Sequence, residues 1–325
     1  MNGQEHRVFI LMTSVVPLLG VAAAAVLLWN DVLGASDVVA FVVMSTVTGL
    51  GITIGYHRLL THRAFETSRA LRLLFTTAGA MAAQGPPIIW AAHHRRHHRV
   101  ADKPGDPHSP YADHEPGLRG AAKGLWHSHL GWLFSPDLTS DPVRYTPDLL
   151  RDRDLRFISR NFLWFVLAGM LLPGLIGLAL TGTLAGFATG VLWGGLVRLF
   201  VGNHTTYAIN SIGHYYGSRR FPTSDESRNV SWLALVSWGE AWHNNHHAFP
   251  RSASHGMRWY EVDVSAIAIR LMERLGLVWN VIRIDREILD RRAAGPRAGR
   301  NAPHEPPLPL AERRKAAAVG ATDVE

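Results

Sequence analysis

Histidines stand in three short stretches of the chain at spacings that suit a shared metal ion. His57 and His62 form the first stretch. The other two are triplets with the same H-x-x-H-H spacing, namely His94, His97 and His98, and His243, His246 and His247. Residues at i, i+3 and i+4 share one face of a helix, so each triplet would project three imidazoles together. Since neutral imidazole suits Fe, Zn, Cu and Ni, the pattern predicts a nitrogen-rich metal site.

The pair formed by His57 and His62 sets a geometric condition. Five residues along an α-helix turn a side chain through about 140°. These two histidines can therefore share a metal only if the helix ends between them.

The composition restricts which metals and partners are possible. The 325 residues include 18 histidines and no cysteine, which excludes disulfides, thiolate-held zinc and Fe–S clusters within the chain. The sequence carries no signature of a haem or flavin domain either. The formal net charge of +7 suits an anionic surface or substrate. Without a helix-turn-helix, RRM or KH motif, nucleic acid is not an expected partner.

Four apolar runs are long enough to cross a hydrocarbon core of about 30 Å. They are residues 9–29, 38–56, 161–180 and 184–202. The short connections within each pair lack Lys and Arg, whereas arginines flank the other ends, so the positive-inside rule places both termini in the cytoplasm. Arg198 inside the fourth run is expected either to be paired or to snorkel. The predicted fold is an all-α integral membrane protein with four transmembrane helices, arranged as two hairpins under a cytosolic His-rich helical cap.

The cap is assigned to residues 57–160 and 204–290, so that residues 1–290 form one domain. Residues 291–325 lack apolar periodicity and are expected to be a disordered tail. Residues 71–90 are apolar but interrupted by charged, polar and proline residues. A single crossing there would place one of its flanking arginine groups outside, so a helix in the interface or packed under the cap is favoured over a further span.

Two hypotheses other than an enzyme are weaker. Transporter sites lie near the bilayer midplane, whereas every histidine stretch here falls at the cytoplasmic end of a span or in the cap. A structural metal site needs only about four ligands. The chain offers at least eight candidates, which is enough for two metal ions.

The chain resembles the membrane fatty acyl desaturases, and within them the stearoyl-CoA (delta-9) type in a bacterial form without a fused electron-donor domain. The resemblance covers roughly residues 35–290. It rests on the order and spacing of several motifs, which are residues 57–63, both triplets, Asn210 to His214, Asp106-Pro107-His108, Leu130-Gly131-Trp132, residues 225–229 and Phe249-Pro250.

The resemblance implies a di-iron centre held by nine histidines. The matching positions are His57, His62, His94, His97, His98, His214, His243, His246 and His247. Asn210 matches the residue that reaches one metal through water. One position departs from the stearoyl-CoA type, which has Trp where this chain has Tyr207. An acyl chain carried on a lipid or a carrier protein therefore stays an alternative to acyl-CoA.

Several other polar residues are expected close to the ligands without binding metal. Glu240 and His243 form an E-x-x-H pair as in ferritin-like di-iron proteins, but no second such pair occurs, so Glu240 is expected to orient a ligand imidazole. His93 precedes the first triplet as Trp242 precedes the last one, so His93 is expected behind the ligands, as are Asp106 and His108. The substrate-pocket candidates are Tyr207, Trp90 and Gln84. The remaining histidines are expected to be structural or pocket residues (His127, His129 and His204) or to lie outside the site (His114, His255 and His304).

The function implied is O₂-dependent insertion of a cis double bond, at the delta-9 position, into a long-chain saturated acyl-CoA. Removing hydrogens from an unactivated methylene pair needs an oxidant generated from O₂ at iron, which zinc cannot supply. Electrons must come from outside the chain, and a ferredoxin or similar carrier with an NAD(P)H reductase is expected. The expected location is the lipid bilayer of the bacterial inner (cell) membrane. The alternative enzyme is a di-iron hydroxylase acting on alkanes, sterols or carotenoids.

Overall fold

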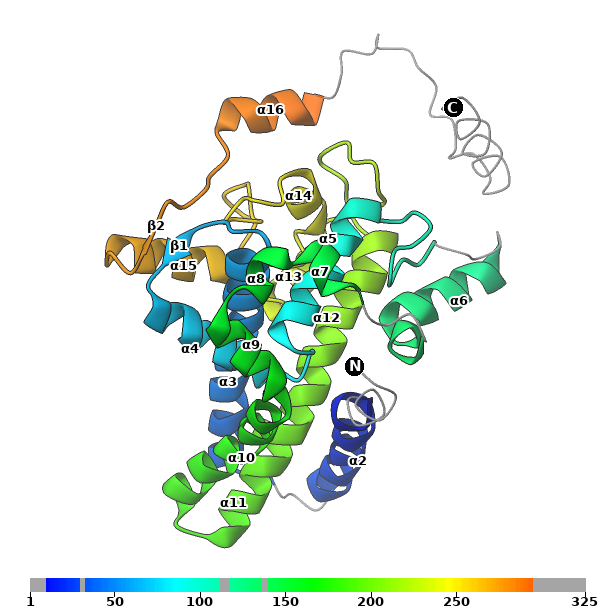
Figure 1. The fold of residues 1–325 in the computed structure, drawn as a ribbon. Coiled ribbons are helices and arrows are strands. Elements are labelled where there is room, and N and C mark those ends of the chain that lie inside the picture. Colours follow the sequence, from blue (N-terminus) through cyan, green and yellow to red (C-terminus); the bar gives the residue numbers. More distant parts are fainter. Residues whose placement is uncertain (1–9, 30–32, 112–116, 136–139, 295–325) are drawn as a thin grey trace.

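The chain is divided into a bundle of long helices and a cap of shorter ones stacked on one end of that bundle (Figure 1). The computed structural model describes residues 10–29, 33–111, 117–135 and 140–294. Almost all regular structure in these residues is helical.

Among the described residues, three helices are long and apolar enough to cross a membrane, namely Ala35–Thr61, Phe162–Thr181 and Leu184–Tyr215. The first is α3 (Ala35–Leu50) followed by the π-helical stretch η2 (Gly51–Thr61). The second is α10 (Phe162–Thr181), and the third joins α11 (Leu184–Gly190), η4 (Val191–Val197) and α12 (Arg198–Tyr215). Apolar side chains on their outer faces remain exposed, such as Val42 at 54% and Leu175 at 52%. A lipid environment accounts for this exposure, since the backbone polar groups of a helix are satisfied internally.

These three helices correspond to the second, third and fourth predicted spans. The first predicted span contains η1 (Leu11–Val15) and α2 (Val16–Trp29), and its apolar helix Thr13–Leu27 is shorter than the other three. This helix packs against η4 and α12. The exact four-span topology therefore stays a prediction.

The apolar segment 71–90 does not form one continuous helix. It is split between α4 (Arg69–Ala80) and α5 (Pro87–Val100), with a non-helical connection between them. The 12 residues of α4 extend about 18 Å at 1.5 Å per residue, which is short of the hydrocarbon thickness. Because α4 also packs along η2, the structure favours the expected helix under the cap over a further span.

Arg198 is paired and does not snorkel. Its side chain is 2% exposed and donates hydrogen bonds to three backbone carbonyl oxygens. These belong to Gly194 at 3.0 Å, Met81 at 3.2 Å and Gly169 at 2.6 Å. The guanidinium thus links the fourth span to α10 and to the end of α4, where the bundle meets the cap.

The turn between α10 and α11 follows from its residues. Gly182 has a φ of 69°, a left-handed conformation that glycine adopts without a steric penalty. The Thr183 hydroxyl accepts a hydrogen bond of 3.0 Å from the amide of Gly186, which caps α11. The two helices can therefore reverse direction within three residues.

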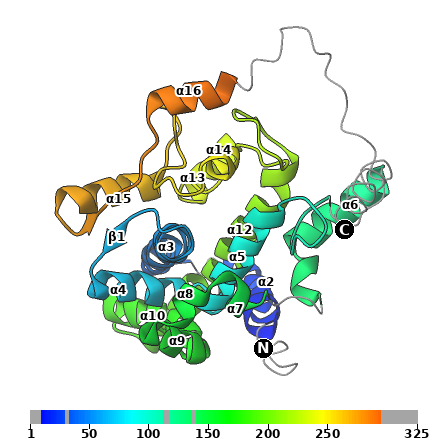
Figure 2. The same ribbon diagram turned by 45° about the horizontal axis from the view of Figure 1, so that its top comes forward.

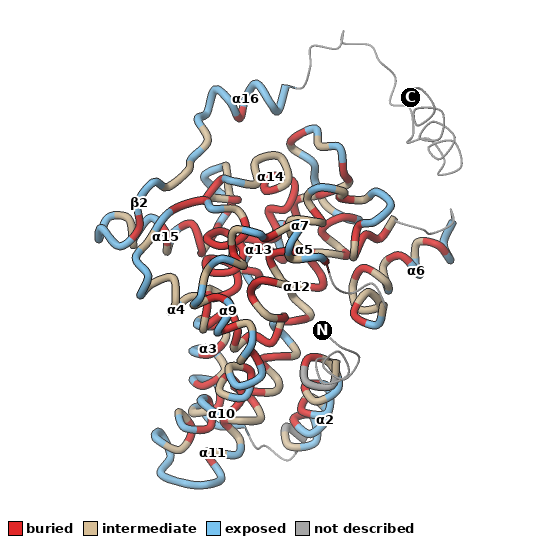
Figure 3. Tube along the Cα trace, in the orientation of Figure 1, coloured by how far each residue is buried: buried red, intermediate tan, exposed pale blue. Residues whose placement is uncertain are grey.

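Short helices surround the upper ends of α5 and α12 in the cap (Figure 2). They are α6 (Leu118–His129), η3 (Gly131–Phe134), α7 (Pro142–Tyr145), α8 (Pro147–Leu150), α9 (Arg153–Arg160), α13 (Ser231–Val236), α14 (His243–Ala248), α15 (Val264–Arg274) and α16 (Arg286–Ala294). Two short strands, β1 (Glu66–Thr67) and β2 (Val278–Trp279), pair antiparallel with Glu66 opposite Trp279. Figure 3 shows that buried residues concentrate in the cap and along the inner faces of the bundle.

The predicted tail begins within a helix. Residues 291–294 belong to α16, and residues 295–325 lie outside the described residues. The same is true of His114 and His304.

Candidate metal centre

All nine predicted ligand histidines meet in the cap in two groups. The five-histidine group contains His57, His62, His94, His98 and His246, and the four-histidine group contains His97, His214, His243 and His247. Within each group the ring nitrogens lie within 4.8 Å of one another. The nine histidines come from four parts of the chain. His57 lies in η2 and His62 follows it directly. The first triplet lies in α5, His214 in α12 and the last triplet in α14.

The ring nitrogens face one another at distances that suit metal ligation. In the five-histidine group, the Nε2 atom of His246 lies 3.1 Å from that of His57 and 2.8 Å from that of His98. In the four-histidine group, His214 Nε2 lies 2.9 Å from His243 Nε2. Two nitrogens bound to one ion at about 2.1 Å and at right angles would be about 3.0 Å apart. The residues present therefore fit two metal ions.

A buried orphan atom points to the same conclusion. Nε2 of His62 is buried and has no hydrogen-bond partner among the described residues. A buried polar atom left unpaired is unfavourable. A metal ion within the five-histidine group would satisfy it.

The winding of η2 brings His57 and His62 together. The amide of His62 donates to the carbonyl of His57 at 3.1 Å, which is an i to i+5 hydrogen bond and therefore π-helical. In this winding, residues five apart fall on nearly the same face. The helix ends at Thr61, as the spacing required, but the wider turn also contributes to the alignment.

Carboxylates hold four of the histidine rings from behind. Nδ1 of His97 donates to Asp106 at 3.0 Å, Nδ1 of His214 to Asp102 at 2.8 Å, and Nδ1 of His247 to Asp225 at 3.0 Å. His57 Nδ1 is in close contact with Glu240. Such contacts fix the ring orientation and leave the Nε2 lone pair for the metal. Glu240 and Asp106 therefore lie where the sequence placed them, whereas Asp102 had no sequence signal beyond its position four residues after the triplet.

The titration behaviour of these groups follows from burial. Burial holds the pKa values of His94, His98, His243 and His246 well below the usual range, so their rings are neutral and able to ligate. Burial raises the pKa of Asp102, but the His214 ring and hydrogen bonds outweigh it and bring the pKa to about 2. Asp102 is therefore ionised at neutral pH.

His255 was expected outside the site, and this prediction is wrong. It is fully buried, with its ring centroid 4.4 Å from that of His246. Its Nε2 lies 3.4 Å from Nε of Arg58, which is also fully buried. Arg58 in turn pairs with Glu240 and Asp263, both at 3.1 Å. Arg58 therefore lies behind the five-histidine group.

The other histidines lie near the two groups or further away. His93 contacts Ser140 at 3.1 Å, belongs to neither group, and has a pKa lowered by burial to about 4. His108 is buried against His97 with ring centroids 4.5 Å apart. His129 contacts Ser211 and His204, each at 3.0 Å. Their positions agree with the structural roles expected of them.

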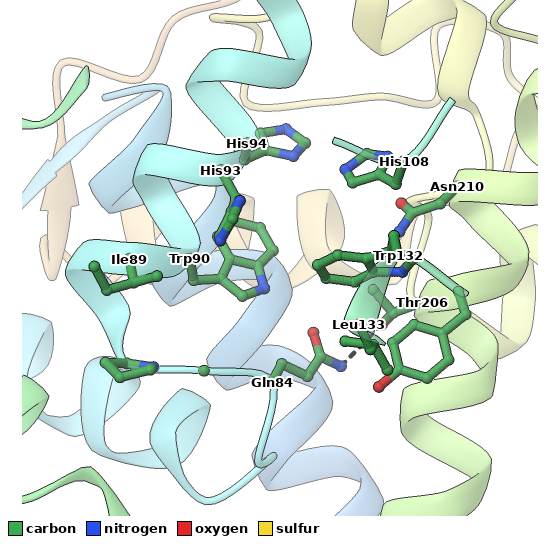
Figure 4. A pocket seen from close by; sticks show the side chains of 13 residues that line it. Gln84, Ile89, Trp90, His93, His94, His108, Trp132, Leu133, Thr206 and Asn210 are labelled. Carbon is green, nitrogen blue, oxygen red and sulfur yellow. Dashed lines mark hydrogen bonds between the residues drawn. The ribbon is translucent and has the colours of Figure 1, made fainter. Parts of the chain in front are cut away.

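Two cavities adjoin the histidine groups. The larger, of about 430 Å³, touches His57 and His94 of one group and His97 and His243 of the other. The smaller cavity, of about 70 Å³, is lined by Tyr207, which is 5% exposed. His108 and Trp132 also line it (Figure 4). Residues that line both are Gln84, Trp90, His94, Thr206 and Asn210. The amide of Gln84 donates to the Thr206 hydroxyl at 2.9 Å, where the cavities adjoin (Figure 4).

Apolar spans that end in two groups of buried, convergent histidines define a membrane-embedded metalloenzyme. A sequence model of the family described as "Fatty acid desaturase" matches residues 35–264. This is well over half of the chain, which therefore belongs to the fatty acid desaturase family.

Three relatives illustrate the range of the family. Hex-5-enoyl-[acyl-carrier protein] acetylenase of Moorena producens (strain JHB) is 39% identical over 86% of this chain and 87% of its own length. The sn-1 stearoyl-lipid 9-desaturase of Anabaena variabilis is 39% identical over 74% of this chain and 81% of its own. Delta-9 acyl-lipid desaturase 1 of Arabidopsis thaliana is 40% identical over 78% of this chain and 77% of its own length. The resemblance to the family is confirmed, whereas the stearoyl-CoA type is not shown, since these three relatives are named for acyl-lipid and acyl-carrier-protein substrates.

Replacing His255 by Ala should destabilise the protein. The substitution leaves a cavity beside His246 and removes a contact of the buried Arg58 guanidinium, with an expected loss of about 2 kcal/mol. Thermal unfolding of the purified protein in detergent measures this. Asp290→Ala, at an exposed position of α16, is the control and should melt close to the wild type. An unchanged melting temperature for His255→Ala would contradict the structural role.

Proposed function

We propose that this desaturase uses O₂ to introduce a cis double bond at the delta-9 position of a saturated long-chain acyl group. The observation that carries the proposal is the larger cavity, because it touches both histidine groups. Its volume of about 430 Å³ lies within the range of small-molecule sites. An acyl chain in it would pass directly beside both metal positions.

The metal ions proposed are two irons held by the nine histidines, with Asn210 reaching one of them through water. When bound, iron supplies the activation of O₂ and the redox chemistry. One saturated acyl chain, one O₂, two electrons and two protons give one mono-unsaturated chain and two waters. The electrons are proposed to come from a ferredoxin or similar carrier reduced by an NAD(P)H reductase.

The residues of the chain position the substrate. Trp90 stacks on the His94 ring, with centroids 5.2 Å apart and planes at 17°, so it fixes a ligand and forms part of the cavity wall at once. Gln84 and Thr206, which line the same cavity, are joined by a hydrogen bond. Apolar side chains such as Ile52, Leu199 and Ile209 complete the wall and exclude water. A single carbon pair can thus be held next to the metals.

The acyl carrier proposed is a membrane lipid, in preference to acyl-CoA. Several residues that line the cavity are also exposed on the outer surface of the helices, namely Val42 (54%), Val201 (44%), Leu235 (63%) and Val236 (58%). The first two belong to helices proposed to cross the bilayer. A chain attached to a lipid could therefore reach the cavity from the side. The names of the relatives from Anabaena variabilis and Arabidopsis thaliana support the same carrier.

The proposed location is the bacterial inner membrane, with four spans and both termini in the cytoplasm. The helices α5 and α14, which carry the two histidine triplets, lie in the cap at one end of the bundle (Figure 1). This position supports cytoplasmic chemistry, in which the electron carrier has access to the centre, rather than transport through the midplane.

The ligand assignment predicts the iron content of variants. The purified wild type should contain two iron ions per chain. His246→Ala and His243→Ala each remove one ligand from a different group and should each reduce the content to about one, with loss of activity. His93→Ala is the matched control, since His93 adjoins His94 in the chain but belongs to neither group. Elemental analysis measures iron, and two ions retained in both ligand variants would refute the assignment.

The reaction is tested with one acyl group on three carriers. Stearoyl chains are supplied as phospholipid in vesicles, as acyl-CoA and as acyl-carrier protein, together with O₂, ferredoxin, reductase and NADPH. We expect mono-unsaturated product from the phospholipid, with loss of two hydrogens in mass spectrometry and a break at carbon 9 after ozonolysis. Turnover of the CoA ester alone would refute the lipid carrier. Gain of one oxygen as the main product would indicate a hydroxylase instead.

The four-span topology predicts which side of the membrane carries the tip of the second hairpin. Because the native chain lacks cysteine, a single Gly182→Cys substitution provides a unique label site. In intact cells, a membrane-impermeant maleimide should react with it from outside. A Cys at Arg258, an exposed residue of the cap, should react only after the membrane is permeabilised. The opposite pattern would invalidate the orientation.

A further inference from the structure

The two histidine groups differ in the charge that lies behind them. In the four-histidine group, three of the four rings are backed by a carboxylate, with Nδ1 to oxygen distances of 2.8 to 3.0 Å. These carboxylates are Asp102, Asp106 and Asp225. Within the described residues, His57 is the one ring of the five-histidine group that a carboxylate backs in this way, and that carboxylate is Glu240.

A cation reduces the negative charge behind the five-histidine group still further. The Arg58 guanidinium lies 3.1 Å from Glu240 and 3.1 Å from Asp263. All three residues are buried. Asp263 does not contact a ligand ring; it accepts hydrogen bonds from the amides of His255, Gly256 and Ala266. Burial raises the pKa of Glu240 to about 8. Glu240, Asp263 and Arg58 together therefore carry at most one negative charge, compared with three behind the four-histidine group.

This difference acts on the metal in two ways. A carboxylate that accepts the Nδ1 proton makes the imidazole a stronger donor at Nε2. Its charge also favours the higher oxidation state of an ion on the other side of the ring, and charges interact strongly where water is excluded. Both effects are larger at the four-histidine group, so they add.

We propose that the four-histidine group stabilises the more oxidised of the two iron ions, so that its ion is oxidised first and reduced last. This inference rests on the proposed di-iron centre. In each reduction step one ferric ion accepts one electron from an external one-electron donor and becomes ferrous. The ion in the five-histidine group takes the first electron and the ion in the four-histidine group takes the second. Asp102, Asp106 and Asp225 are then positioning residues that act through their histidines.

A redox titration of the holoenzyme loaded with ⁵⁷Fe tests this order. Mediators of known potential supply electrons, and Mössbauer spectra count ferric and ferrous ions at each potential. The wild type should contain two irons per chain that are reduced in two separate one-electron steps. Removing the charge in Asp102→Asn should make the second step easier. The ferric-to-ferrous ratio of that ion should fall at least tenfold at a fixed potential, which equals about 59 mV for one electron.

Opposite shifts in two variants separate a charge effect from general damage. Asp102→Asn should bring the two steps together, because it acts on the ion that is harder to reduce. Asp263→Asn should move them apart, because it removes a negative charge behind the other ion. Asp102→Glu keeps the charge and should keep the wild-type separation even if the ring shifts. Asp290→Asn removes an exposed carboxylate of α16 and should change neither step.

The possible failures are distinguishable. If the wild type binds fewer than two irons, the di-iron proposal itself is refuted, and this inference with it. If two irons are bound but reduced in one step, or if Asp102→Asn and Asp263→Asn shift the separation in the same direction, only the proposed difference between the two ions is refuted. Should Asp102→Asn lose iron, Asp225→Asn provides the same test through His247.

Discussion

Nine imidazoles meet in the interior of the cap, and the structure depends on holding their nitrogens face to face. Pairs of Nε2 atoms approach to 2.8–3.3 Å within the two groups. Neutral rings at such distances cannot all pair with one another, since each offers a single N–H. Carboxylates that accept the Nδ1 protons of four rings direct the Nε2 lone pairs inward. The loops of the cap are shaped by these contacts, because Asp102 also accepts the amide of Glu226 at 2.7 Å.

The membrane helices deliver part of this centre directly. The span that begins at Ala35 ends with His57 in its last turns, and the span that begins at Leu184 continues without a break to His214. The relative position of these two spans therefore determines where His57 and His214 lie relative to each other. Arg198 joins the second of these spans to α10 and to the end of α4, and α4 in turn packs along η2 of the first. A buried cation with three acceptors is better suited to this than apolar packing alone, since hydrogen bonds to charged groups are strong and directional.

Local spacing predicted more of the site than of its surroundings. Both triplets could be predicted because three histidines on one face of a helix fall within five residues of sequence. The long helices could be predicted because each is a continuous apolar run. His214 is a lone histidine and was assigned only through the family resemblance. The π-helical winding of η2 has no clear sequence signature. Arg58 and Asp263 are 205 residues apart in sequence, so their pairing, and the burial of His255 beside them, follow only from the folded structure.

The carboxylates behind the four-histidine group stand apart from the larger cavity, whereas the carboxylate behind the five-histidine group does not. The cavity touches both groups, and Glu240 is part of its wall. Asp102, Asp106 and Asp225 are absent from that wall and reach the centre only through ligand rings. Substitutions in the cavity can therefore alter which acyl chain is held without altering the charge behind the four-histidine group.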